Sequence, residues 1–197
     1  TLSMRIVTPH WTRELSVAFW LSGSDRACVK ISAPPKEAGI ASLRLGGSMW
    51  NYFPKVERTV KIPVSLMMQP WMGSDFTNDD MMRATSFAKD YTHSFKSVRG
   101  TGESAEWEVA SVPKDGVPVL WGKIVTSVGP DYLPRKQEFY SERGVLTKVL
   151  TYDDFQVIGG RRYPRVWTMR APAKKDSFTR IVYRSILFDG PVPSGVF

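Results

Sequence analysis

Few residues of the chain have the types and spacing that catalysis requires. The segment 116–123 has one residue too many between its two glycines for a phosphate-binding loop, and it lacks the Ser or Thr that would hold magnesium. Asp75, Thr77 and Asp79 have the spacing of a calcium-binding loop. Asp80, however, stands where that loop needs glycine for its turn. We therefore expect this acidic segment to cap a helix.

Other candidate sites are equally weak. Gly100-x-Gly102-x-x-Ala105 resembles a dinucleotide fingerprint, but it lies among polar residues and not between a strand and a helix. The two histidines, His10 and His93, are too few for a His-rich zinc site. Catalytic residues, metal ligands and cofactors are therefore all predicted as none. A catalytic pair of Asp or Glu side chains that the fold brings together from distant positions stays an open interpretation.

The single cysteine limits the redox chemistry. Cys28 alternates with Val29 and Ile31 in RACVKIS, so we expect a strand residue and not a nucleophile. One cysteine also excludes an internal disulfide, which fits a reducing cytosol or an exported protein that has no disulfides. The N-terminus, TLSMRIVTPHW, has no basic region followed by an apolar core, so we expect no signal peptide and a trimmed or mature chain.

Positive charge is concentrated near the C-terminal end. The net charge is +8, and residues 161–184 supply most of the excess. Three interpretations stay open: a solvated face, docking on an anionic membrane or acidic partner, and nucleic-acid binding by the interleaved Tyr163, Trp167 and Tyr183. We predict docking through the basic run and no nucleic-acid partner. The predicted docking residues are Arg162, Arg170 and Lys174.

The elements that would position any site are predominantly strands. Apolar and polar residues alternate with period two in roughly ten segments separated by Gly-, Pro- and Asp-containing turns. The alternation predicts a mainly β fold, with one curled antiparallel sheet that forms an incomplete barrel, apolar inside and solvated outside. A length of 197 residues fits one domain over 1–197.

Residues 64–91 interrupt this alternation. The segment begins with the Pro-interrupted VSLMMQPWM and continues into a predicted helix over 78–91, with Met81, Ala84, Ala88 and Tyr91 on one stripe. We predict that it forms a short, mobile helical lid, hinged at Gly73–Ser74, that fills the open barrel until a ligand displaces it.

Methionine is concentrated around this lid. Six of the eight methionines lie between Met49 and Met82. Methionine is unbranched and polarizable, so it packs against long, flexible apolar ligands such as acyl chains, although a plain core remains an open interpretation for each residue. The predicted lipid-contacting residues are Leu15, Val17, Phe19, Val29, Ile31, Leu43, Trp50 and Tyr52 on the sheet and Leu66, Met67, Met68, Trp71, Met72, Phe76, Met81 and Met82 on the lid.

Three stretches carry a family resemblance. MWNYFP over 49–54 has the W-x-Y-x-P form, MGSDF over 72–76 precedes an acidic-led helix, and FDGPVP over 188–193 closes the chain. Together they resemble the LolA-like family of outer-membrane lipoprotein-sorting proteins. The N-terminal helix and signal peptide of that family have no counterpart in this sequence.

The resemblance implies an incomplete antiparallel β-barrel with helices over its open side. It implies a monomeric periplasmic carrier, not an enzyme, that binds acyl chains of lipoproteins or other lipids and delivers them towards the outer membrane. An inner-membrane transporter and an outer-membrane acceptor would be its partners. The alternatives are an enzyme that uses the same cavity for an apolar substrate and a lipid-binding accessory protein of an inner-membrane lipid exporter.

Overall fold

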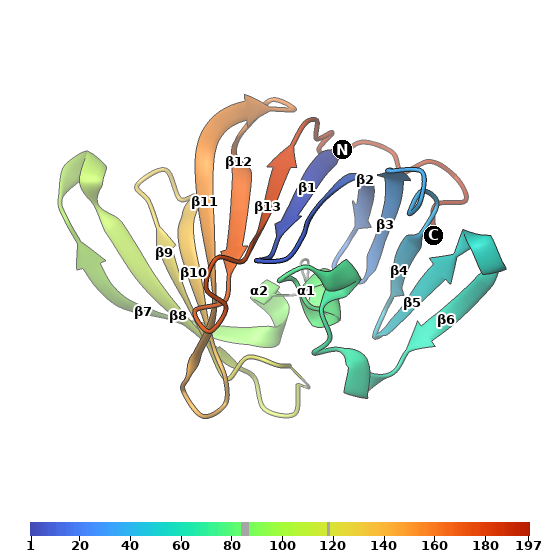
Figure 1. The fold of residues 1–197 in the computed structure, drawn as a ribbon. Coiled ribbons are helices and arrows are strands. Elements are labelled where there is room, and N and C mark those ends of the chain that lie inside the picture. The colour runs from blue at the N-terminus through green and yellow to red at the C-terminus, as the bar shows by residue number, and fades with distance from the viewer. Residues whose placement is uncertain (84–86, 118) are drawn as a thin grey trace.

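The computed structural model describes residues 1–83, 87–117 and 119–197. Within them, thirteen antiparallel strands form one sheet (Figure 1). The first six strands are β1 Leu2–Val7, β2 Thr12–Ser22, β3 Arg26–Ala33, β4 Ala41–Leu45, β5 Ser48–Phe53 and β6 Arg58–Ile62. The other seven are β7 Tyr91–Arg99, β8 Glu106–Pro113, β9 Lys123–Val128, β10 Pro134–Tyr140, β11 Leu146–Ile158, β12 Arg161–Arg170 and β13 Phe178–Tyr183. The predicted mainly β class is confirmed.

The sheet consists of two meanders joined through the two ends of the chain. The strand order is β6-β5-β4-β3-β2-β1-β13-β12-β11-β10-β9-β8-β7, so β1 pairs with β13 in the middle and β6 and β7 are the edges. In Figure 1 the sheet curls, while its two edge strands lie far apart. The prediction of an incomplete barrel is confirmed.

Two strands lie where the sequence pattern did not place any. β1 was not recognised, although Leu2, Met4 and Ile6 are all buried on its inner side. Most side chains of β7 are exposed on both faces, so its sequence, YTHSFKSVR, lacks the apolar alternation of a half-buried strand. The expectation of roughly ten strands was therefore too low.

The link from β6 to β7 crosses the concave side of the sheet (Figure 1). It contains the 3₁₀ turns Val64–Leu66 and Trp71–Gly73 and the helices α1 Asn78–Arg83 and α2 Phe87–Asp90. The predicted helix over 78–91 is thus two short helices, Tyr91 begins β7, and Ala84 lies outside the described residues. No helix in the described parts of the chain has the length and apolar character needed to cross a membrane.

A reciprocal pair of hydrogen bonds starts α1. The Asp80 amide donates to Thr77 Oγ1 at 3.1 Å, and Asp80 Oδ2 accepts from the Thr77 amide at 2.7 Å. This arrangement is a capping box, which satisfies two amide groups that the first helical turn leaves free. The acidic segment thus caps a helix as expected, with Thr77 as the capping residue.

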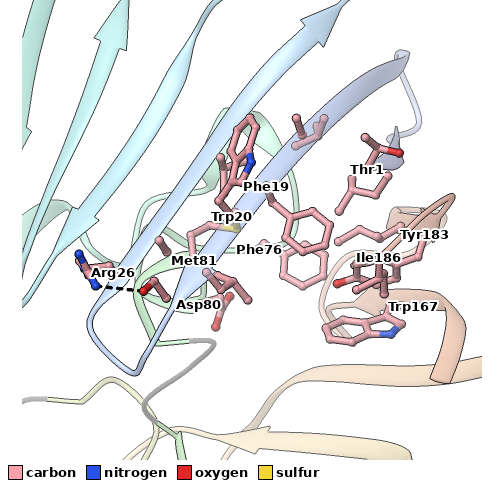
Figure 2. A pocket seen from close by; sticks show the side chains of 18 of the residues that line it. Thr1, Phe19, Trp20, Arg26, Phe76, Asp80, Met81, Trp167, Tyr183 and Ile186 are labelled. Carbon is pink, nitrogen blue, oxygen red and sulfur yellow. Dashed lines mark hydrogen bonds between the residues drawn. The ribbon is translucent and has the colours of Figure 1, made fainter. Parts of the chain in front are cut away.

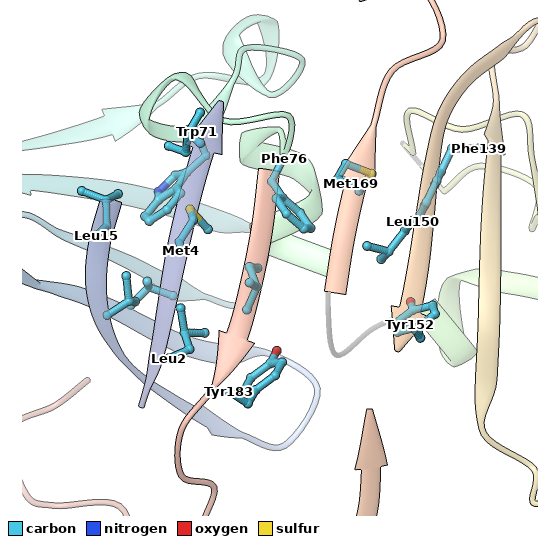
Figure 3. Packing of buried hydrophobic residues seen from close by; sticks show 14 of the residues in the cluster. Leu2, Met4, Leu15, Trp71, Phe76, Phe139, Leu150, Tyr152, Met169 and Tyr183 are labelled. Carbon is cyan, nitrogen blue, oxygen red and sulfur yellow. The ribbon is translucent and has the colours of Figure 1, made fainter. Parts of the chain in front are cut away.

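The core lies between the concave face and this insertion. Figure 3 shows Trp71 of the insertion beside Met4 and Leu15, and Phe76 between that group and Met169 of β12. Trp71 is among the largest fully buried side chains. A buried aromatic side chain contributes on the order of 3 kcal/mol, so the insertion is part of what stabilises the sheet.

The inward orientation predicted for three residues of β4 and β5 is wrong. Val29 of the inner face pairs with Ser42, so Leu43 points to the outer face, and register then places Trp50 and Tyr52 there too. The inner position of Ser42 is polar because its Oγ accepts the indole N–H of Trp71 at 2.8 Å. The rule that apolar positions face inward failed at this position because a buried tryptophan needed an acceptor.

Candidate functional site

The concave face of the sheet and the insertion border a cavity of about 1360 Å³. Drug-sized pockets usually measure roughly 300–1,000 Å³, so this one can take a larger ligand. The sheet contributes mostly apolar side chains, among them Val17, Val29, Ile124 and Leu150. Its floor is formed by Trp71, Phe76, Met81, Phe87 and Tyr91 of the insertion and the start of β7.

Aromatic side chains from three parts of the chain meet on the cavity wall. In Figure 2, Phe19 points toward Tyr183, and Trp167 and Ile186 lie beside them. The ring centroids of Phe19 and Tyr183 are 5.7 Å apart and those of Trp167 and Tyr183 are 5.2 Å apart, both in edge-to-face arrangements. Tyr152 and Tyr163 complete the cluster. Such contacts hold the rings in fixed orientations.

The tyrosine hydroxyls of this cluster have partners. Tyr152 donates to Gln137 Oε1 at 2.6 Å, and the hydroxyls of Tyr163 and Tyr183 share a hydrogen bond. Burial raises the pKa of all three tyrosines, so each remains neutral. The wall therefore has polar atoms but no charge at this end, which suits an apolar ligand.

The C-terminal strap, residues 184–197, forms the rim of the cavity. It begins where the N-terminal amino group donates to the Ser185 carbonyl at 2.7 Å. Arg161 then pairs with Asp189. The strap ends at Phe197, whose ring centroid lies 5.4 Å from the guanidinium carbon of Arg26. The strap thus runs from the β11–β12 hairpin to the β2–β3 hairpin.

Polar contacts fasten the insertion to the sheet. The Asp75 carboxylate accepts from Thr179 Oγ1 at 2.8 Å, and Thr179 accepts from the Asp75 amide at the same distance. Lys148 of β11 pairs with Asp80 at 2.9 Å, and both side chains are almost fully buried. Removing one partner of such a pair leaves an uncompensated charge in the interior. These contacts hold α1 and the loop before it against the barrel.

The predicted hinge is a hydrogen-bonded turn in this structure, with Ser74 buried and Gly73 exposed. Met72 and Gly73 have left-handed φ angles of 52° and 75°, and the second of these favours glycine. Arg13 donates to the Met72 carbonyl, and Ser74 Oγ donates to the Trp71 carbonyl at 2.7 Å. Opening at this step would have to break both hydrogen bonds. The mobility of the lid stays a prediction.

The predicted lipid-contacting residues fall into four groups. Val17, Phe19, Val29, Trp71, Phe76 and Met81 line the cavity. Leu15, Ile31, Met67 and Met72 belong to or pack against the core around it. Leu66 and Met68 are exposed, and Leu43, Trp50 and Tyr52 occupy the outer face. The side chain of Met82 lies outside the described part of the structure.

Several residues of the cavity were not singled out from the sequence. Met4 and Met169, the two methionines outside the Met-rich stretch, both line it, as do Trp121, Phe139 and the tyrosine cluster. Their inward positions on alternating strands were the available signal. The contribution of the strap carries no comparable signal, because its sequence has no regular period.

The basic run is largely neutralised by nearby groups. Arg162 pairs with Asp131 at 3.1 Å, Lys174 lies 3.8 Å from Asp75, and the guanidinium carbon of Arg170 lies 5.1 Å from the Phe178 ring centroid. Burial opposes ionisation of Asp131, but hydrogen bonds from the Leu133 amide and Arg135 outweigh it and lower its pKa. Docking through this run stays a prediction.

Comparisons with known proteins decide the family. A family model with the description "Uncharacterized protein" matches residues 23–197. No curated protein sequence matches the chain. A structure of a DUF1329 family protein from Desulfovibrio piger superposes with a TM-score of 0.88 at 18% identity, covering 98% of this chain and 85% of that one.

Two further structures carry the LolA name or function in their descriptions. A LolA superfamily protein from Nitrosomonas europaea superposes with a TM-score of 0.80 at 24% identity, covering 96% of this chain and 85% of the other. A putative outer membrane lipoprotein-sorting protein domain from Vibrio parahaemolyticus gives 0.83 at 19% identity, covering 98% and 86%. The chain belongs to the family of that model, and its fold is LolA-like. The resemblance predicted from the LolA-like motifs is confirmed. Because the sequence identities are this low, the solved structures show only that this chain shares their fold.

Proposed function

We propose that this LolA-like protein is a non-catalytic periplasmic carrier that binds the acyl chains of lipoproteins or other lipids in its cavity. The observation that carries the proposal is the apolar cavity between the concave face and the insertion. The Vibrio parahaemolyticus structure, which is described as a putative lipoprotein-sorting protein domain, supports the same function. Delivery would run from an inner-membrane transporter to an outer-membrane acceptor, with the carrier as a monomer.

The cavity wall suits a long, chemically plain ligand. Each buried CH₂ contributes roughly 0.8 kcal/mol, so one long acyl chain gains on the order of 10 kcal/mol before the costs of ordering. Met4, Met81 and Met169 can repack around chains of different shape. The tyrosine cluster adds a rigid surface to the same cavity. This combination favours apolar area over specific hydrogen bonding.

Release requires that binding not be too strong. In this structure Phe76 and Met81 of the insertion contribute to the cavity floor. A ligand that displaces them loses part of its gross gain, which brings the free and loaded states closer in free energy. We propose that the insertion is the element that moves when cargo enters or leaves.

Mass spectrometry of an organic extract from gently purified protein tests the proposal. We expect co-purifying phospholipid, lipopeptide or fatty acid, and we expect delipidated protein to bind a fluorescent acyl probe in competition with palmitate. An empty extract together with no probe binding would refute lipid carriage. Chemical turnover of a bound small molecule would favour an enzyme on the same fold.

A further inference from the structure

The edge of the sheet next to the insertion exposes large apolar side chains. Val56 has an exposed fraction of 63%, Val64 of 81% and Met68 of 53%, and Val60 and Leu66 are also exposed. They belong to β6 and to the turns on either side of it. We call residues 55–68 the β6 edge. In Figure 1 this strand lies at the extreme right of the sheet, far from the other edge strand, β7.

Positive charge on the β6 edge has no acidic partner among the described residues. Lys55, Arg58 and Lys61 stand against one acid, Glu57, in this segment. Among the described residues, no ion pair involves Lys55, Arg58 or Lys61, although every basic residue predicted for docking in the 161–184 run contacts an acid or a ring. On this edge, positive charge without an acidic partner therefore lies in the same segment as exposed apolar side chains.

Aromatic side chains border the same edge on the outer face. Trp50 and Tyr52 of β5 pair with Lys61 and Thr59 of β6, and the Lys61 ammonium lies 5.6 Å from the Trp50 ring centroid. Tryptophan, tyrosine and lysine together are typical of side chains at a lipid–water interface, where rings sit at headgroup level and amines meet phosphates. Exposed aliphatic side chains on the same edge, such as Val64, can reach the boundary between the headgroups and the acyl chains.

We propose that the β6 edge docks on an anionic phospholipid surface. The partner is chosen by charge complementarity. Three cations that form no ion pair among the described residues share this segment with exposed valine, leucine and methionine side chains, which suits a fluid anionic surface. The inference goes beyond the proposed carrier function, because docking requires no cargo and can be measured with an empty cavity.

The docking edge is also hydrogen-bonded to the lid. The Asn78 side chain donates to the Leu66 carbonyl at 2.9 Å, the Asn78 amide to Gln69 at 3.0 Å, and the Asp79 amide to Met67 at 3.0 Å. The start of α1 is therefore attached to the backbone that carries Leu66 and Met68. A surface that holds these side chains would act directly on the element that covers the cavity.

Co-sedimentation with vesicles tests the proposal. The delipidated protein should bind vesicles of phosphatidylglycerol and phosphatidylcholine, with binding that weakens as salt rises, and should bind pure phosphatidylcholine poorly. The triple variant Lys55→Gln/Arg58→Gln/Lys61→Gln should lose about 100-fold in partitioning, from about one charge contact per residue. Val56→Ser/Val64→Ser/Met68→Ser should lose roughly tenfold or more.

Two matched controls make the result interpretable. Arg162→Gln/Arg170→Gln/Lys174→Gln removes the same charge outside the β6 edge, and we expect less than about a threefold loss because these side chains already contact an acid or a ring within the protein. Val157→Ser removes an exposed valine outside the β6 edge, with no expected loss. Circular dichroism should stay unchanged in all variants. The melting temperature should stay unchanged in the β6-edge variants and in Val157→Ser, since their altered side chains are exposed and make no ion pair among the described residues.

Three results would overturn the proposal. These are wild-type protein that ignores anionic vesicles, edge variants that bind like wild type, and a charge control that falls as far as the edge triple. An edge reserved for a protein partner would give the second result. Acyl-probe binding without vesicles should be equal in the wild type and the edge variants, so failure of docking is distinguishable from failure of the carrier function.

Discussion

The two halves of the Met-rich stretch both carry apolar side chains, including methionines, but these side chains lie in opposite environments. Residues 55–68 leave most of their apolar side chains in solvent, whereas most residues of 71–81 are buried against the sheet. Adjacent residues show the boundary: Met67 is 7% exposed and Met68 is 53% exposed. The difference teaches that composition alone did not decide burial. Polar anchors did, because Trp71, Asp75 and Asp80 each have a partner on the sheet.

Removing a buried anchor of the insertion should cause the largest loss in the free energy of unfolding. Lys148→Met leaves the Asp80 carboxylate buried without its cation, which should lower the free energy of unfolding by about 3–5 kcal/mol. Urea denaturation measures this, and the double variant Asp80→Asn/Lys148→Met should recover most of the loss. A single variant within about 0.5 kcal/mol of the wild type would show that the pair does not hold the insertion.

The neighbouring methionines provide a smaller and sharper test. Met67→Ala should cost about 2–5 kcal/mol through the cavity it leaves in the core. Met68→Ala, an identical change one residue along, should stay within about 0.5 kcal/mol. Thermal and urea unfolding of both variants give the two numbers. Equal losses would contradict the boundary between the exposed and buried halves.

The smallest effect concerns the basic run, which differs from the β6 edge in having paired charges. The folded pKa of Asp131 is lowered, so its contribution to stability is present above the unfolded pKa and is lost as pH falls through the folded pKa. The stability of Asp131→Asn should therefore fall less steeply than that of the wild type below about pH 4. Urea midpoints across that range measure it. Parallel profiles would show that the contacts of the Asp131 carboxylate with Leu133, Arg135 and Arg162 have no energetic weight.

The sheet was predictable because its signal is local. Alternation over β2, β3 and β8 to β13 needs only neighbouring residues, and so do the turns between them. The phase of β4 and β5 was not predictable, since Ser42 faces inward to meet Trp71, 29 residues away. Leu43, Trp50 and Tyr52 were assigned to the wrong face for the same reason.

The site was less predictable than the fold. Lys148 and Asp80 are 68 residues apart in sequence, and no local sequence pattern predicts that they pair. Tyr163, Trp167 and Tyr183 were interpreted together with the arginines around them. Only the register of β12 and β13, in which Trp167 pairs with Ile181, brings their rings into one cluster. The contacts of side chains that depend on strand register cannot be predicted from local sequence and are found only in the folded structure.

The most direct measurement of the central claim is acyl-probe binding to two methionine variants. Met81 lines the cavity and Met68 is exposed on the β6 edge, so Met81→Asp and Met68→Asp place the same charge in the two environments. A carboxylate facing an acyl chain is strongly unfavourable. With both variants folded by circular dichroism, the carrier account predicts that Met81→Asp loses probe binding at least about 30-fold while Met68→Asp keeps it, from a desolvation cost of about 2 kcal/mol or more. Normal probe binding by Met81→Asp would contradict the account.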